Sequence, residues 1–188
     1  MKTKTPATIE DLYRVPGKAE LVNGEIVLMS PTGDIPGYAA DEIYASLRDY
    51  ARQAKRGHAL ADNKSFIVDL PNRKSFSPDA AIHMNKLNVG FHHGPPLFAV
   101  EVRSEHDYGP AVDRKIAAKI KDYFDAGTQV VWDVDVLRER VIRVYRAASA
   151  GEPAIYREGE MAEAEPAVPG WRILVDDILY EEAEDTEE

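Results

Sequence analysis

The chain has 188 residues, 44% of them hydrophobic and 30% charged, which predicts one globular domain at residues 1–180. It has no cysteine, which excludes a disulfide framework and a thiolate zinc site. No apolar run is long enough to cross a bilayer and none follows the N-terminus, so we expect a cytoplasmic protein with no secretory signal and no membrane partner. The net charge of −10 comes from residues 157–188, and we expect residues 181–188 to be a disordered acidic tail. The rest of the chain carries no net charge, so composition neither supports nor excludes a nucleic-acid partner.

The N-terminal residues predict a short helix followed by a hairpin. Thr8 is a suitable helix cap, and Asp11 stands three residues on, where an acid completes a capping box. Two short strands are expected at 18–22 and 25–30. Asn23-Gly24 joins them, and because this dipeptide tolerates positive φ at both positions it favours a tight turn.

The middle of the chain changes from helical to extended periodicity. Apolar residues recur at helical spacing up to Gly57, which predicts a long helix at 37–56. Three apolar segments bounded by Pro, Asn and Gly then predict strands at 66–68, 80–82 and 97–102.

A strand, helix and strand follow in order. A second helix is predicted at about 112–126, ending at Gly127, and further strands at 130–134 and 141–145. This order predicts a crossover between parallel strands. We therefore expect an α/β fold with a central mixed sheet flanked by helices and preceded by the N-terminal hairpin.

Two carboxylates stand in the predicted strands. Side chains alternate along a strand, so Glu101 interrupts an otherwise apolar segment and is costly to bury without a cation or hydrogen-bond donors. Asp79 stands at the start of an earlier strand. A salt bridge between Glu101 and Arg103 at the strand end is the alternative explanation.

Lys119 is the lysine of the second helix best placed to meet these acids. It lies about 60° from Ile116 at the border of the predicted buried stripe, so its aliphatic stem can run along the sheet toward Glu101. An ordinary surface lysine is the alternative.

Together these residues resemble the Uma-type restriction endonuclease family, a branch of the PD-(D/E)XK nuclease superfamily. The similarity runs along most of the chain, through residues 20–25, 30–33, 77–79, 95–104, 119–123, 126–128, 131–132, 134–135 and 169–171. The resemblance implies a restriction-endonuclease-like core and a homodimer, with DNA as the substrate.

The resemblance also implies the site. Asp79 and Glu101 would be metal ligands, Glu20 from the hairpin would complete the acidic cluster, and Lys119 would be the catalytic lysine. Hard oxygen ligands suit Mg²⁺ or Mn²⁺, which can activate a water and neutralise charge on a phosphate. The expected activity is therefore metal-dependent hydrolysis of DNA phosphodiester bonds.

Three departures from the family pattern bear on this expectation. Arg103 occupies the position where the superfamily usually has its lysine, and arginine cannot act as a base. Pro36 replaces a histidine found in many relatives before the long helix, and Glu105 adds a charge where proline is common.

Two other functions remain open. His83, His92 and His93 lie between the two strand acids and could suggest zinc or iron, although adjacent residues seldom ligate one ion. The same fold could also be a non-catalytic binding or assembly module, with the acids in structural ion pairs.

Overall fold

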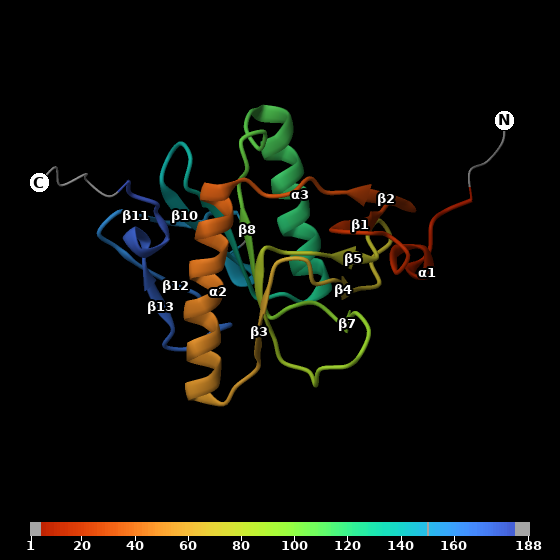
Figure 1. Ribbon diagram of the computed structural model, residues 1–188, viewed down its shortest axis with the longest axis horizontal. Helices are drawn as coiled ribbons and strands as arrows, with labels where there is room; N and C mark the ends of the chain where they lie inside the picture. The colour runs from red at the N-terminus through yellow and green to blue at the C-terminus, as the bar shows by residue number, and fades with distance from the viewer. Residues whose placement is uncertain (1–4, 150, 183–188) are drawn as a thin grey trace, which may run out of the picture.

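The computed structural model describes residues 5–149 and 151–182. Its centre is a six-stranded sheet in the order β11-β10-β9-β8-β6-β3 (Figure 1). These strands are β3 His58–Ala61, β6 Ala80–His83, β8 Phe98–Val102, β9 Val130–Asp135, β10 Val141–Arg146 and β11 Ala154–Arg157. Strands β8 and β9 are parallel and the other neighbours antiparallel, so the sheet is mixed and the predicted fold class is confirmed.

The parallel pair is connected by α3 (Pro110–Ala126), as the strand-helix-strand order predicted. The helix begins two residues earlier than expected, because Pro110 takes the first helical position, where its fixed φ is favourable and a missing N–H costs nothing. It ends at Gly127, whose φ of 110° places it in the left-handed region.

The long helix α2 (Asp34–Ala54) also begins before its predicted start at residue 37. Pro36 was expected in a turn and instead lies in the first helical turn. The first N–H groups of a helix have no carbonyl partner within it, so proline is tolerated there. The cap is Gly33, which makes no side-chain hydrogen bond to the helix.

The two helices cover opposite faces of the sheet because side chains alternate along β8. Phe98, Val100 and Val102 belong to the apolar cluster that contains Ile43 and Leu47 of α2. Their neighbour Ala99 belongs to the second cluster, together with Ile120 and Tyr123 of α3. β8 is therefore buried on both faces, and Glu101 lies on the α3 side.

The predicted hairpin forms from β1 (Ala19–Val22) and β2 (Glu25–Leu28), which ends two residues earlier than expected. Asn23 and Gly24 both have positive φ, 51° and 73°. The hairpin is a separate two-stranded sheet to the right of the central one in Figure 1. Leu21 connects it to the chain around β5 (Ser75–Phe76), because its carbonyl accepts from Lys74 N at 2.8 Å and its N–H donates to Ser75 Oγ at 2.8 Å. Before it, α1 (Ile9–Leu12) has the predicted Thr8–Asp11 capping box.

Several short elements were not predicted from the sequence. Besides β3 and β11, they are β5 Ser75–Phe76, β7 His92–His93, β12 Met161–Glu163, β13 Arg172–Leu174 and the 3₁₀ turns Ala147–Ser149 and Val175–Ile178, whereas β4 (Phe66–Ile67) lies within the strand predicted at 66–68. The C-terminal strands lead into the core, since the ring of Trp171 stacks on Trp132 at 5.1 Å. Most of the expected disordered tail, residues 183–188, lies outside the described residues. None of the helices in the described ranges is long and apolar enough to span a membrane.

Candidate functional site

Glu20 is the buried carboxylate of the hairpin. Its Oε1 accepts the N–H of Ser77 at 2.9 Å and lies 2.9 Å from Lys119 Nζ, while its Oε2 accepts from Arg73. Burial raises the pKa of Glu20, but Lys119 and Arg73 outweigh that effect and hold the pKa below its usual value. Glu20 is therefore a charged side chain with a fixed orientation.

Glu101 comes from β8 and faces α3. Lys119 donates to its Oε2 at 2.8 Å, and the hydroxyl of Tyr123 donates to its Oε1 at 2.6 Å. Burial raises the pKa of Glu101, Lys119 lowers it, and the charges of Asp79 and Glu20 raise it further, so the net direction is upward. Glu101 is therefore easier to protonate than an exposed glutamate, chiefly because it is buried.

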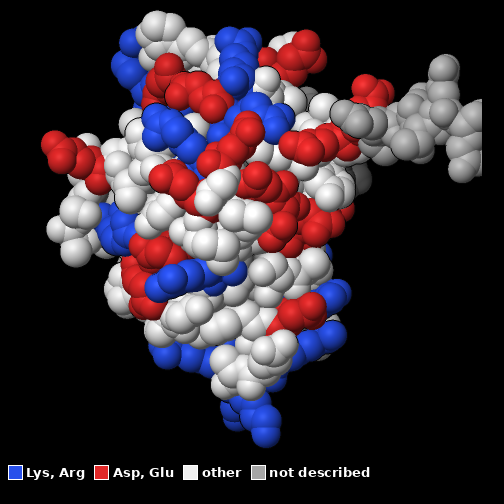
Figure 2. Space-filling model, turned by 90° about the vertical axis from the view of Figure 1, so that its left-hand side faces the viewer, with Lys and Arg blue, Asp and Glu red and all other residues white. Residues whose placement is uncertain are grey.

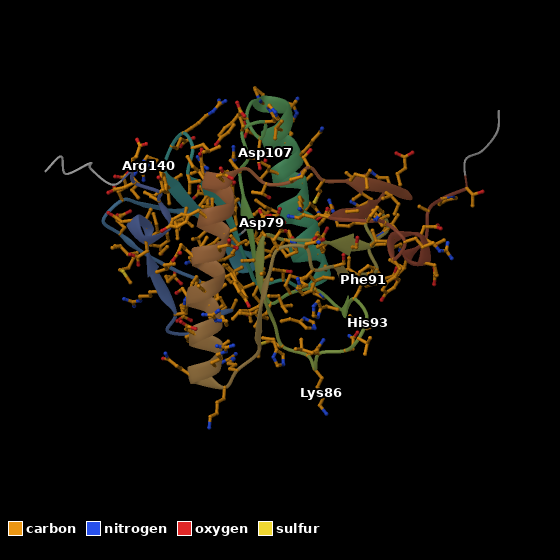
Figure 3. The ribbon with its side chains drawn as sticks, in the orientation of Figure 1. Asp79, Lys86, Phe91, His93, Asp107 and Arg140 are labelled. Carbon is orange, nitrogen blue, oxygen red and sulfur yellow. The ribbon has the colours of Figure 1, made fainter. Side chains whose placement is uncertain are left out.

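Asp79 immediately precedes β6, as the sequence predicted. Its Oδ2 accepts the N–H of Val102 at 2.7 Å, which fixes the carboxylate against β8. Its Oδ1 lies 2.5 Å from Lys18 Nζ, and this ammonium also contacts Asp62 at 2.7 Å. In Figure 3 Asp79 lies near the centre of the protein, in contrast to Lys86 on an outlying loop.

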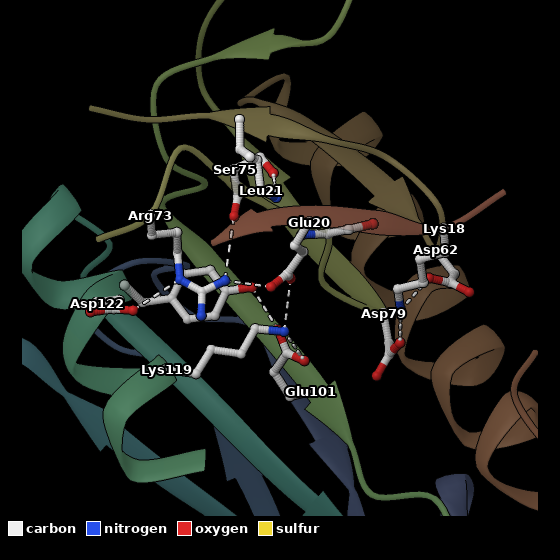
Figure 4. A network of polar contacts seen from close by, with 12 residues as sticks. Lys18, Glu20, Leu21, Asp62, Arg73, Ser75, Asp79, Glu101, Lys119 and Asp122 are labelled. Carbon is white, nitrogen blue, oxygen red and sulfur yellow. Dashed lines mark hydrogen bonds and ion pairs between the residues drawn. The ribbon is translucent and has the colours of Figure 1, made fainter. Parts of the chain in front are cut away.

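The four predicted site residues thus lie in one neighbourhood, in two sets (Figure 4). Lys119 joins Glu20 of the hairpin to Glu101 of the central sheet. Asp79 makes its own ion pair with Lys18, and it is linked to the first set through the backbone of β8 and through its charge acting on Glu101.

The alternative explanations for Glu101 and Lys119 are wrong. Arg103 does not pair with Glu101; it donates twice to Asp133, at 2.7 and 2.8 Å, and once to Asp113 at 3.0 Å. Lys119 is not a surface lysine, because its side chain is only 17% exposed. Burial lowers the pKa of Lys119, but the charges of Glu101 and Glu20 together raise it by more.

The histidines occupy a different place. His83 and His92 both pack with Phe66, and the two imidazole rings are 5.0 Å apart. His93 is exposed. Burial lowers the pKa of both packed histidines, which favours neutral rings within an aromatic cluster.

A hollow of about 500 Å³ lies on the same face of the sheet, beyond Arg103. It is lined by three arginines, three carboxylates and two tyrosines, together with residues of α3; the charged and phenolic members are Arg103, Tyr108, Asp113, Asp135, Arg138, Glu139, Arg143 and Tyr145. Because these charges compensate one another, the hollow offers no excess charge to attract a phosphate.

The donor set around Glu101 fits a hard divalent cation. Among the described residues no three His, Asp or Glu side chains are grouped closely enough to form a complete metal cage. Mg²⁺, however, is usually held by one or two carboxylates, with water and substrate phosphate completing its shell. Asp79 and Glu101 supply two such groups, and a bound cation would favour the charged form of Glu101, which burial disfavours.

Sequence reasoning missed Lys18, Arg73, Asp62 and Asp122. Arg73 links Glu20 to Asp122, donating to Asp122 at 2.9 Å. Nothing in the polar sequence around Arg73 distinguishes it from a surface residue. Lys18 did have a signal, since it stands two residues before Glu20 and alternation along an extended chain puts both on one side.

Comparison with known proteins agrees with the fold and with the family resemblance. The crystal structure of a putative nuclease belonging to DUF820 from Anabaena variabilis superposes with a TM-score of 0.72 and 16% identity, covering 92% of this chain and 97% of that one. At that identity the likeness concerns the fold. No curated protein matches the chain. Residues 9–176 match the family described as "Uma2: Putative restriction endonuclease", so the chain belongs to the Uma2 family.

Proposed function

We propose that this protein is a metal-dependent endonuclease that hydrolyses phosphodiester bonds of DNA. Membership of the Uma2 family supports the reaction class. The observation that carries the proposal is the buried ammonium of Lys119, which lies 2.8 Å from Glu101 and 2.9 Å from Glu20 on a different sheet. A buried lysine between acids, beside a further carboxylate at Asp79, is costly to assemble for packing alone.

In this proposal Asp79 and Glu101 hold Mg²⁺ or Mn²⁺, and Glu20 completes the acidic cluster. The ion would activate a water and neutralise charge on the phosphate. Glu20 fixes the position of Lys119 through their ion pair, and Tyr123 fixes the position of Glu101 through its hydrogen bond. Since Glu101 and Glu20 keep Lys119 charged, we assign its ammonium to orienting the water and stabilising negative charge on the phosphate oxygens, not to removing a proton.

DNA would approach the α3 side of the sheet, where these residues lie. Figure 2 shows the side of the protein that lies on the left in Figure 1, near the C-terminal strands, where acidic and basic side chains are interleaved. Binding to DNA phosphates draws its affinity from Lys and Arg side chains, and on this side carboxylates lie among them. The homodimer stays a prediction, which sedimentation can test.

Plasmid cleavage tests the proposal. We expect the wild type to nick or linearise supercoiled DNA with Mg²⁺ or Mn²⁺, and Asp79→Asn, Glu101→Gln and Lys119→Met each to lose about 100-fold or more in rate. Lys121→Met is the matched control, because Lys121 is on the same helix but its side chain is 73% exposed. Absence of cleavage with every metal and DNA form would reject the proposal.

A non-catalytic binding module is the second candidate. It is favoured by one observation: each acid of the cluster already has a cationic partner, namely Lys18, Arg73 or Lys119. Mn²⁺ titration separates the two, since a module held by structural ion pairs should bind no metal at Asp79 or Glu101.

A further inference from the structure

Lys18 is a further cation at the site, and it was not predicted there from the sequence. It enters the hairpin just before β1, and its side chain is only 14% exposed. Its Nζ lies 2.5 Å from Asp79 Oδ1 and 2.7 Å from Asp62 Oδ1 (Figure 4). The ammonium therefore bridges a buried acid of the site and a more peripheral acid, because the side chain of Asp62 is 39% exposed and that of Asp79 is 10% exposed.

The ammonium occupies the oxygen of Asp79 that a metal would use. Oδ2 of Asp79 is committed to the N–H of Val102 at 2.7 Å, which leaves Oδ1 as the oxygen facing Lys18. A divalent ion bound to that carboxylate would stand within a few ångströms of the ammonium. The two cations would compete for the same oxygen of Asp79, and like charges so close in a partly buried site repel, so Lys18 is expected to give up that contact.

We propose that Lys18 is a displaceable counter-ion that neutralises Asp79 in the metal-free protein and moves to Asp62 when a divalent cation binds. This inference rests on the proposed function, because it assumes a metal at Asp79 and Glu101. Lysine suits the role, since its charge is carried on a flexible four-carbon stem and needs no fixed geometry. Asp62 already touches the ammonium, so a small rotation releases Asp79 without stranding the charge.

The two partners of this exchange have opposite predicted effects on metal binding. Lys18→Met removes the competing cation, so the Kd for Mn²⁺ should fall by about tenfold. Asp62→Asn removes the alternative partner, holds Lys18 on Asp79 and should raise the Kd. Lys121→Met is the control, because its pair with Asp125 is also 2.5 Å long but exposed, and it should leave the Kd unchanged.

Isothermal titration calorimetry with Mn²⁺ measures these constants on the full chain without relying on cleavage. Lys18→Gln repeats the test with a polar side chain, and circular dichroism checks that each variant is folded. An unchanged or higher Kd in both Lys18 variants, with binding abolished in Asp79→Asn, would overturn the counter-ion role and leave the metal site standing. If neither wild type nor the Lys18 variants bind Mn²⁺, both the inference and the proposed metal site fail.

Discussion

Arg73 donates to Glu20 where both side chains are almost fully buried, 8% and 4% exposed. The same guanidinium donates through its Nε to Asp122 of α3 at 2.9 Å. One arginine thus joins the hairpin to the helix that carries Lys119. The carboxylate of Glu20 is thus held by Arg73 as well as by Lys119.

Replacing this arginine should strongly destabilise the protein. In Arg73→Met two buried carboxylates, Glu20 and Asp122, lose a cation, and we expect the free energy of unfolding to fall by about 3–5 kcal/mol in urea denaturation. Arg48→Met is the control, because its pair with Asp49 is exposed and worth at most about 1 kcal/mol. Equal losses in the two variants would show that the buried bridge contributes nothing special.

Glu101 should make the metal-free protein less stable at neutral pH. Its raised pKa, caused first by burial, means that folding disfavours the charged form. The penalty is therefore absent below the pKa of the unfolded chain and grows as the pH rises toward the folded pKa. Glu101→Gln should melt at a higher temperature than wild type at pH 8 in EDTA, with the difference shrinking toward pH 4. A lower Tm at pH 8 would contradict this sign.

Arg103 should not be able to take over from Lys119. Its guanidinium is bound by Asp133 and Asp113, so a lysine at the same position would be expected to pair with these acids and not with the cluster. In the plasmid assay, Arg103→Lys combined with Lys119→Met should cleave no faster than Lys119→Met alone. Recovery of cleavage in the double variant would mean that residue 103 can reach the reacting phosphate.

Trp171 should anchor the C-terminal strands. Its ring stacks on Trp132 at 5.1 Å, and its Nε1 donates to Ser46 of α2 at 3.0 Å. Trp171→Ala should cost about 3–5 kcal/mol of unfolding free energy, as other deletions of large buried rings do. Ser46→Ala, which removes only the hydrogen bond, should cost about 1 kcal/mol. Similar losses in the two variants would show that the stacking contributes little.

Local sequence signals predicted the parts of this fold that local physics determines. Asn23-Gly24 predicted the hairpin because its backbone freedom is intrinsic to those residues. The helical position of Lys119 correctly predicted its approach to Glu101, since one helix and one adjacent strand suffice to define it. The start of α2 was predicted too late because of Pro36, since proline suits both a turn and the first turn of a helix.

The contacts that could not be predicted join segments far apart in the chain. Arg73 meets Glu20 across 53 positions and Asp122 across 49, so only the assembled fold pairs them. The short strands β11 and β13 were also missed, because runs of 4 and 3 residues with mixed exposure carry too little periodicity.

The alternation of β8 has a consequence for how errors of assembly are rejected. A slip of this central strand by one residue would exchange its faces, carrying Glu101 into the apolar layer with Trp132 and turning Val100 toward Lys119. Such a chain would lose its acid from the cluster and place an unpaired charge among aromatic rings, which is too costly to persist. A misalignment of β8 that would disable the cluster would therefore also destabilise the fold. The backbone hydrogen bonds that set the register of β8 thus maintain the fold and the cluster together.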